Sequence, residues 1–232
     1  MFVMMWLGES VLSVFYPRVC VICGQRMDTN EHICADCMHS LPRTEHATLR
    51  NNRLEDLFVK DNRFVRGAAF LFYDDDGSVR RLIHELKYAE NPWLAYEVAY
   101  AAALEYATTD FFEGIDSIVP IPLHPHRLRT RGYNQSLYIA KGLSDVTNIP
   151  IDVQHLSRVR NNAQQALKVG EERERNVVDI FKTSYPEEMY RKHILLVDDV
   201  ITSGLTIRSA MNAMKTFKGC SISVFTLVHS KR

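Results

Sequence analysis

Two neighbouring carboxylates, followed by hydroxyl residues and a glycine, form the most informative segment of the chain. Asp198 and Asp199 come directly after the apolar stretch 194–197, and the segment leads into an expected helix. Ligands of parallel sheets bind beyond the carboxyl ends of the strands, and a glycine-containing turn at a helix start directs N–H groups at a phosphate. The segment therefore predicts a monophosphate-binding turn formed by Thr202, Ser203, Gly204, Leu205 and Thr206.

The two carboxylates add a second function to this turn. Asp198 and Asp199 are placed to accept hydrogen bonds from vicinal sugar hydroxyls, and their charge favours a nearby hydrated magnesium ion. Carboxylates and turn together fit a phosphorylated ribose. The alternatives are a plain strand–turn–helix capped by a threonine, and the acidic cluster of a response-regulator receiver. A receiver needs a later phosphoacceptor aspartate, whereas only about thirty residues follow this pair, so position disfavours it.

A basic run follows the expected strand 115–121. Pro122 and Leu123 lead into it, and we expect its arginines to lie in an irregular loop where alternate guanidinium groups converge on one diphosphate. Asn134 and Gln135 supply further donors at the start of the next helix. The arginines are Arg127, Arg129 and Arg131. The alternative for this run is a solvated surface or a contact with nucleic-acid backbone.

Four of the five cysteines form two Cys-x-x-Cys pairs. The pairs are Cys20 with Cys23 and Cys34 with Cys37. A glycine follows Cys23, as the tight backbone turn around a tetrahedral ion requires. We therefore expect one structural zinc site with four thiolate ligands and no open coordination position, which excludes zinc-dependent catalysis. Disulfides and redox chemistry are the alternatives. His32 and His39, which flank the second pair, are expected to be loop residues and not ligands.

Strand and helix patterns alternate along the chain. The expected order is strand 67–73, helices 78–88 and 93–106, strand 115–121, helix 134–143, strands 149–156 and 194–197, a helix, and strand 221–228. Such a series predicts an α/β fold with a mostly parallel sheet flanked by helices. We divide the chain into residues 1–65, an N-terminal helix and zinc module with a polar connector from residue 41, and residues 66–232, the main domain.

Composition excludes some classes of function. Lys plus Arg and Asp plus Glu are equal at 28 each among 232 residues, so phosphate or nucleic-acid binding must come from local basic clusters. Residues 1–17 are apolar but interrupted by Glu9, without a basic start or cleavage site, which argues against a signal peptide. No apolar run is long enough to insert into a membrane. We expect an amphipathic helix over the zinc module and a cytoplasmic protein.

Several of these segments resemble one known family. Residues 197–206 are similar to the ribose-phosphate motif of type I phosphoribosyltransferases, Val200 included. The cysteine pairs and residues 83–88, 119–124 and 127–136 resemble the ComF branch of that superfamily, the ComFC- and GntX-like proteins. The resemblance implies a type I phosphoribosyltransferase-like domain that binds 5-phosphoribosyl-1-pyrophosphate (PRPP) with magnesium and transfers phosphoribosyl to an unidentified acceptor.

The resemblance also implies a link to natural competence and DNA uptake. Single-stranded DNA and DNA uptake proteins are then possible partners. The alternative to an enzyme is a non-catalytic protein that senses PRPP or binds single-stranded DNA through its basic loops and zinc module.

Two further groups of site residues follow from the resemblance. The polar stretch 158–176 would be the flexible loop that closes over the substrate, although relatives carry threonine where Asn162 stands. Its candidate residues are Arg158, Arg160, Gln165 and Arg175. Lys87 shares a helical face with His84 and Tyr88 and could face the pyrophosphate. An exposed loop and a surface lysine are the plain alternatives.

Overall fold

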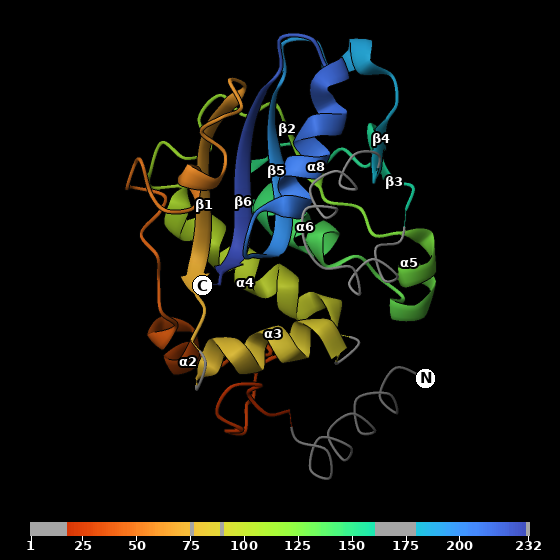
Figure 1. Ribbon diagram of the computed structural model, residues 1–232. Coiled ribbons are helices and arrows are strands. Elements are labelled where there is room, and N and C mark those ends of the chain that lie inside the picture. Colours follow the sequence, from red (N-terminus) through yellow and green to blue (C-terminus); the bar gives the residue numbers. More distant parts are fainter. Residues whose placement is uncertain (1–17, 75–76, 89–90, 161–179, 231–232) are drawn as a thin grey trace, which may run out of the picture.

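Four parallel strands form the centre of the molecule. The computed structural model describes residues 18–74, 77–88, 91–160 and 180–230 (Figure 1). In the order of the sheet, the strands are β1 Phe64–Phe72, β6 Ser221–His229, β5 His193–Ile201 and β2 Ser117–Pro120. Each neighbouring pair is parallel. The carboxyl ends of β5 and β2 therefore open on the same edge of the sheet.

Both faces of the sheet are covered, as the apolar strands require. Along β5, Leu195 and Val197 join one apolar cluster, whereas Ile194 and Leu196 join the cluster on the other face. Helices α3 Ser78–Tyr88, α4 Pro92–Tyr106 and α6 Gln135–Thr147 contribute to the first cluster. Helix α8 Leu205–Ala213 and the short η4 Met214–Thr216 contribute to the second. The predicted α/β fold is confirmed.

Helices α4 and α6 pack with their backbones in close contact. A Cβ atom added at Gly142 of α6 would lie 2.5 Å from the backbone oxygen of Tyr96 in α4. The Tyr96 hydroxyl also donates to Asp145 Oδ2 over 2.9 Å. A glycine at position 142 therefore fixes how near α6, and the residues it carries, lie to α4.

The predicted strand at 149–156 is wrong for most of its length. Within the described residues it contributes a single bridge, Ile151 to Ile118, before the chain turns away. The carboxylate of Asp152 accepts from the backbone N–H groups of Gln154 and His155, which bends the backbone out of the sheet. The chain then forms β3 Leu156–Arg158, which pairs antiparallel with β4 Phe181–Thr183. The short helix η3 Pro186–Met189 follows β4.

The segment 41–65, expected to be a polar connector, is well packed. It contains the short helix η1 Glu55–Leu57, and Leu54 and Phe58 are buried in the core. The Asn52 side chain accepts from the backbone of Leu54 and donates to Gly67 O in β1. The expected boundary at residue 65 falls inside β1, and the division of the chain at that point stays a prediction.

The cysteine-containing segment packs against the first apolar cluster. Cys20, Ile22 and Ile33 are buried in it, next to the short helix α2 Ala35–Ser40. Within the part of the chain that the structure describes, no helix combines the length and the apolar character needed to cross a membrane.

Candidate functional site

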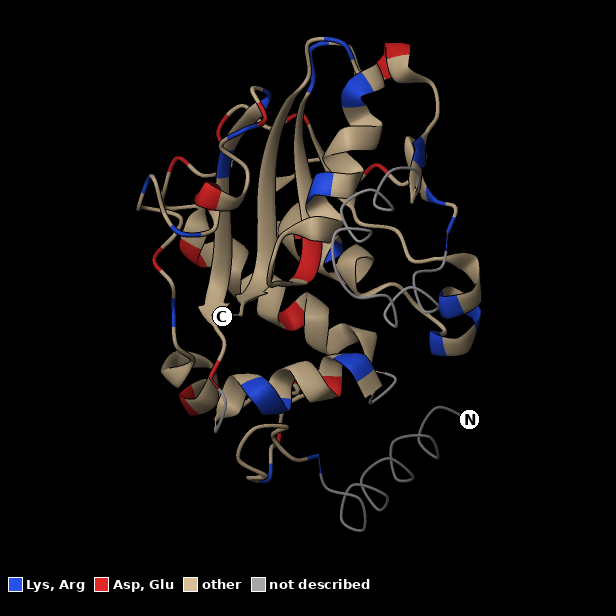
Figure 2. Cartoon of the chain, in the orientation of Figure 1, with Lys and Arg blue, Asp and Glu red and all other residues tan. Residues whose placement is uncertain are grey.

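A large pocket lies beyond the carboxyl ends of β2 and β5. Its volume is about 840 Å³, within the usual range for small-ligand sites. Figure 2 shows the acidic end of β5 and the basic helix α5 Pro125–Arg131 on this side of the molecule. The walls of this main pocket are formed by Lys87, Tyr88, Ile121, Leu123, His126, Arg127, Thr130, Arg131, Tyr133, Gln135, Ser136, Arg158, Asp198, Asp199, Val200 and Thr206.

The carboxylate pair lies inside β5, which runs past the expected strand end to Ile201. Asp198 pairs in register with Thr226 of β6. Its Oδ1 accepts from Ser136 Oγ over 3.1 Å and from the backbone N–H of Asp199 over 3.0 Å. The Oδ1 atom of Asp199 accepts from the backbone N–H of Val200 over 2.7 Å. Among the described residues, neither Oδ2 atom has a hydrogen-bond donor, so both remain available to a ligand.

The pKa of Asp198 is perturbed by its surroundings. Burial, and next the charge of Asp199, raise the pKa of Asp198 to about 7, although the Ser136 hydroxyl and Arg158 oppose this change. Burial also disfavours the charged form of Arg158, so it lowers the pKa of that group, and repulsion from Arg127 lowers it further. The pocket thus brings together two carboxylates and two guanidinium groups whose charges are incompletely neutralised within the protein.

Arg158 has an unusual environment for a guanidinium group. It lies over the ring of Phe181, with its central carbon 5.5 Å from the ring centroid. Its Nε is buried without a partner among the described residues. Arg160 is exposed and does not line the pocket, and Gln165 and Arg175 lie outside the described residues.

The basic run forms helix α5 and not the irregular loop that the sequence suggested. Pro125 occupies its first turn, the His124 side chain accepts from the backbone N–H of His126, and Gly132 ends the helix with φ of 81°. Residues two apart lie on different sides of a helix. Arg127 therefore lines the main pocket, whereas Arg129 does not.

Arg131 and Gln135 line the pocket but are engaged with helix α3. Arg131 Nη2 donates to the Lys87 backbone oxygen over 2.9 Å, and its Nη1 donates to Gln135 Oε1 over 2.9 Å. Gln135 Nε2 donates to the backbone oxygen of Leu86 over 3.1 Å. These bonds satisfy the carbonyl groups at the end of α3 and hold Lys87 at the pocket. We interpret Arg131 and Gln135 as positioning residues.

The Asn134 side chain is also engaged in hydrogen bonds within the protein. Its amide donates to Ile121 O, and its oxygen accepts from the Ser136 N–H at the start of α6. Leu123 lines the pocket, whereas Pro122 and Asn134 do not.

The predicted phosphate turn lies between β5 and α8, and only its last residue, Thr206, lines the pocket. Gly204 has φ of 71°, and a Cβ there would lie 3.2 Å from Phe58 Cζ. Arg208 Nη2 donates to the Ser203 backbone oxygen over 2.6 Å, and its Nη1 donates to Leu57 O over 3.1 Å. The turn is therefore braced from behind by η1. The phosphate role of Thr202, Ser203, Gly204 and Leu205 stays a prediction.

Sequence reasoning missed Ser136 and Tyr133. Ser136 is only 3% exposed, and it shares the buried face of α6 with Ile139, Ala140 and Leu143. A hydroxyl on an otherwise apolar helix face was a signal that could have identified it. Tyr133 lies near the end of α3, and nothing in its sequence spacing distinguishes it from a packing residue.

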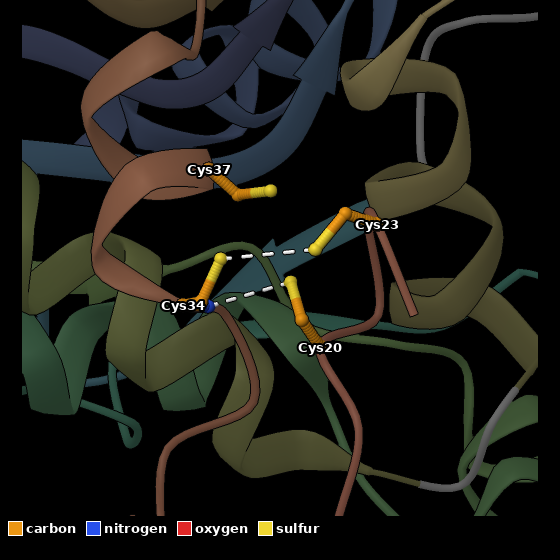
Figure 3. Close-up of side chains that lie close together, drawn as sticks. All are labelled: Cys20, Cys23, Cys34 and Cys37. Carbon is orange, nitrogen blue, oxygen red and sulfur yellow. Dashed lines mark hydrogen bonds between the residues drawn. The ribbon is translucent and has the colours of Figure 1, made fainter. Parts of the chain in front are cut away.

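The four paired cysteines converge in space. Their sulfur atoms all lie within 4.8 Å of one another, and Figure 3 shows the four side chains turned toward a common centre. The set is Cys20, Cys23, Cys34 and Cys37. Gly24, with φ of 75°, makes the tight turn after the first pair. Four thiols at this separation suit a tetrahedral ion.

Glu97 of α4 holds the second cysteine pair in place. Its carboxylate accepts from the backbone N–H groups of His32 over 2.8 Å and Ile33 over 3.1 Å, directly before Cys34. The His32 ring also meets Glu97 Oε2 at 2.9 Å. The His32 ring is therefore engaged with Glu97, and its place outside the ligand set stays a prediction.

Known proteins are similar to this chain over nearly its full length. The phosphoribosyl transferase domain family matches residues 134–232, and the double zinc ribbon domain family matches residues 11–48. DNA utilization protein YhgH of Escherichia coli (strain K12) is 27% identical over 225 residues, 96% of this chain and 95% of YhgH. Competence protein F of Haemophilus influenzae is 25% identical over 91% of this chain and 84% of that protein. Competence protein ComFC of Bacillus subtilis is 26% identical over 92% and 85%, respectively.

We predict that Asp198→Asn stabilises the protein in a pH-dependent way. Because burial raises the pKa of Asp198 in the folded state, the wild type loses stability as pH rises from about 4, the usual pKa of an aspartate, to about 7. The variant should match the wild type near pH 4 and exceed its free energy of unfolding by about 4 kcal/mol at pH 8, because each unit by which the folded-state pKa exceeds the unfolded-state pKa contributes roughly 1.4 kcal/mol. Urea denaturation across this pH range measures the difference.

The exposed Glu113→Gln variant is the control, because it removes a carboxylate outside the pocket. It should show no such pH-dependent gain. A constant difference between Asp198→Asn and the wild type at all pH values would contradict the prediction.

Proposed function

This chain belongs to the ComF/YhgH family, as a protein with a phosphoribosyltransferase domain and an N-terminal double zinc ribbon, and from that premise we propose that it binds PRPP in the main pocket. We propose further that it transfers the phosphoribosyl group to an acceptor. The observation that carries the proposal is the meeting of the Asp198–Asp199 pair with Arg127 and Arg158 in one pocket.

The charges of this pocket match the parts of PRPP. The free Oδ2 atoms of Asp198 and Asp199 suit the two ribose hydroxyls, which donate hydrogen bonds. Arg127 and Arg158 suit the pyrophosphate, because guanidinium groups bind phosphate oxygens in pairs. Thr206, at the first turn of α8, suits the 5-phosphate, which the positive end of the helix dipole attracts.

The donor set also fits magnesium. Hard divalent cations bind carboxylate oxygen and keep several water ligands, and two acceptor atoms of the carboxylate pair have no partner among the described residues. Bound together with PRPP, magnesium would neutralise part of the pyrophosphate charge.

Transfer requires the bond between the anomeric carbon and the pyrophosphate oxygen to break. Its electron pair leaves with the pyrophosphate, while the acceptor's lone pair forms the new bond at the same carbon. Arg127 and Arg158 would stabilise the charge that grows on the leaving group, and Asp198 and Asp199 would orient the ribose.

Calorimetric titration with PRPP and magnesium tests the proposal. We expect the wild type to bind and the Asp198→Ala, Asp199→Ala double variant to bind at least about 100-fold more weakly, because hydrogen bonds to charged groups contribute about 1.5–3 kcal/mol each. Pyrophosphate release in the presence of candidate acceptors then tests transfer separately.

The matched control replaces two exposed carboxylates outside the pocket, as Asp56→Ala with Glu113→Ala. This variant should bind PRPP as the wild type does. Folding of each variant is checked by circular dichroism. Absence of PRPP binding to the folded wild type would overturn the proposal.

We also propose that the cysteine cluster holds one structural zinc ion. The match to the double zinc ribbon family and the convergence of four sulfur atoms support this assignment. Because four thiolates complete a tetrahedral shell, the ion would stabilise the fold and leave no position for a substrate.

We expect one zinc per chain by elemental analysis of the purified protein. The Cys34→Ser, Cys37→Ser variant should lose the metal and unfold at lower temperature. The buried Cys220→Ser variant, outside the cluster, should keep it. A zinc content near zero in the wild type, after purification without chelators, would contradict the assignment.

An aromatic surface favours a second function, the binding of single-stranded DNA. From Tyr133 at the main pocket, rings follow one another at centroid distances of 6.1 Å to Tyr138, 5.4 Å to Trp93, 5.6 Å to Tyr96 and 5.9 Å to Tyr100. We call these five residues the aromatic track. Trp93 is 54% exposed. Exposed rings offer stacking surfaces to unpaired bases of any sequence.

The track connects two hollows. Tyr133 lines the main pocket, whereas Trp93 and Tyr100 line a hollow of about 710 Å³ beside the cysteine-containing segment. Lys141 lies over the Tyr138 ring, with its Nζ 4.3 Å from the centroid, and could meet a DNA phosphate.

Replacing exposed rings of the track should weaken binding to an oligothymidine. We expect Trp93→Ala with Tyr100→Ala to reduce affinity by about 10- to 100-fold, since each stacked base contributes roughly 1–3 kcal/mol. Fluorescence anisotropy at two salt concentrations measures the loss. Tyr190→Ala, an exposed ring outside the track, is the control, and the Asp198→Ala, Asp199→Ala variant should bind DNA normally. Equal affinity of the wild type and the track variant would exclude this surface.

A further inference from the structure

A buried histidine lies between two carboxylates next to strands β3 and β4. The Nδ1 atom of His155 is 2.8 Å from Asp152 Oδ2, and its Nε2 atom is 3.1 Å from Glu188 Oε2. The rings of Tyr185 and Phe217 pack edge-on against the imidazole. Within the described part of the chain, the titratable side chains in contact with the ring are therefore Asp152 of its own turn, Glu188 of η3, and Tyr185 between β4 and η3.

Only the protonated form of this ring can serve both carboxylates. A neutral imidazole has one N–H and donates to one acceptor, whereas the imidazolium donates from both nitrogen atoms. Burial alone would lower the pKa of His155, but the hydrogen bond and charge of Asp152, and next those of Glu188, raise it above its ordinary value. Once the proton is lost, the remaining N–H stays with Asp152, which is nearer and only 14% exposed, while the 62% exposed Glu188 turns to water.

The contacts of His155 join the main sheet to both strands of the β3–β4 pair. The backbone N–H of Asp152 donates to Ile118 O in β2 over 2.8 Å, which fixes Asp152 at the edge of the sheet. Strand β3 begins directly after His155, and Glu188 follows β4. The backbone N–H of Ser184 also donates to His155 O over 3.1 Å.

The β3–β4 pair carries Arg158 at the wall of the main pocket. Arg158 pairs in register with Phe181 of β4 and lies over its ring. Within the part of the chain that the structure describes, its guanidinium group forms no hydrogen bond or ion pair. Its position at the pocket therefore depends on the backbone of β3 and on the Phe181 ring.

We propose that His155 is a positioning residue whose protonated ring, by joining Asp152 to Glu188, holds Arg158 toward the main pocket. Loss of this proton at higher pH releases Glu188, and phosphate groups in the pocket are then bound less tightly. The inference rests on the proposed function, because that function assigns Arg158 to the pyrophosphate.

Calorimetric titration of the full-length protein with inorganic pyrophosphate, at pH 6 and at pH 9, tests this role. At pH 6 the Glu188→Gln variant should bind at least about threefold more weakly than the wild type, because groups in one hydrogen-bond network are energetically coupled. At pH 9, where His155 of the wild type has also lost its proton, the two affinities should agree within about twofold. In an Arg158→Gln background, the Glu188 substitution should change nothing. Asp198 changes charge over the same range, so variants are compared at equal pH.

The matched control is Glu187→Gln. It removes the neighbouring carboxylate of η3, which is exposed and makes no contact with His155, and it should bind pyrophosphate as the wild type does at both pH values.

Urea denaturation of the same variants reports on the link without a ligand. Because the folded-state pKa of His155 is raised, its contribution to stability is present below about pH 6.5, the ordinary histidine pKa, and is lost as pH rises through the folded-state value. The unfolding midpoint of the wild type should exceed that of Glu188→Gln at pH 6 and match it at pH 9.

Three results would overturn the inference: equal midpoints of Glu188→Gln and Glu187→Gln at pH 6, a loss of pyrophosphate affinity that is the same at both pH values, or a loss that persists in the Arg158→Gln background. A wild type with the expected midpoints that binds no pyrophosphate would instead overturn the proposed function's assignment of Arg158.

Discussion

Main-chain ladders with β2 on one side and β6 on the other hold β5 in place, and Asp198 and Asp199 lie near its carboxyl end. Burial of Asp198, and next the like charge of Asp199, oppose ionisation of Asp198 in the folded protein, which is why its pKa rises to about 7. The protein supplies three compensating groups, the backbone N–H of Asp199, the Ser136 hydroxyl and the nearby Arg158. These groups do not neutralise the pair fully. A ligand with hydroxyl groups, or a cation, can therefore bind to the carboxylate oxygens that have no partner among the described residues. Such incomplete compensation is typical of binding sites.

The position of Ser136 depends on how α6 packs on α4. Ser136 lies in the first turn of α6, and the absence of a side chain at Gly142 sets the distance of α6 from α4. The basic wall depends on similar supports. Arg131 and Gln135 hold the end of α3, so that Lys87 faces the main pocket while Arg131 is no longer free to bind an anion. Two arginines of one short stretch thus line the main pocket in different roles: Arg127 is available to a ligand, whereas Arg131 is held by the end of α3.

The sequence predicted the features that depend on local pattern. Neighbours in the chain define the apolar run before Asp198, the helix at 78–88 and the two cysteine pairs. The parallel sheet follows from the alternation of strand and helix patterns along the chain. The strand predicted at 149–156 failed because the Asp152 side chain captures backbone donors that a sheet would have used.

The site was harder to predict for a related reason. Arginines at alternate positions look equivalent in sequence, but the caps at His124 and Gly132 fold them into a helix that separates Arg127 from Arg129.

Helix α4 gives the cysteine cluster and the main pocket a common support. Glu97 accepts hydrogen bonds from the backbone directly before Cys34, and on the same helix Tyr96 contacts Asp145 of α6, the helix that carries Ser136. Contacts of this kind transmit stability: a cluster that fixes the cysteine-containing segment also fixes one side of α4. They do not by themselves transmit a signal, because signalling needs an element with two alternative arrangements, each favoured by a different ligand state. The chain of contacts therefore assigns the cysteine cluster a supporting role toward the main pocket.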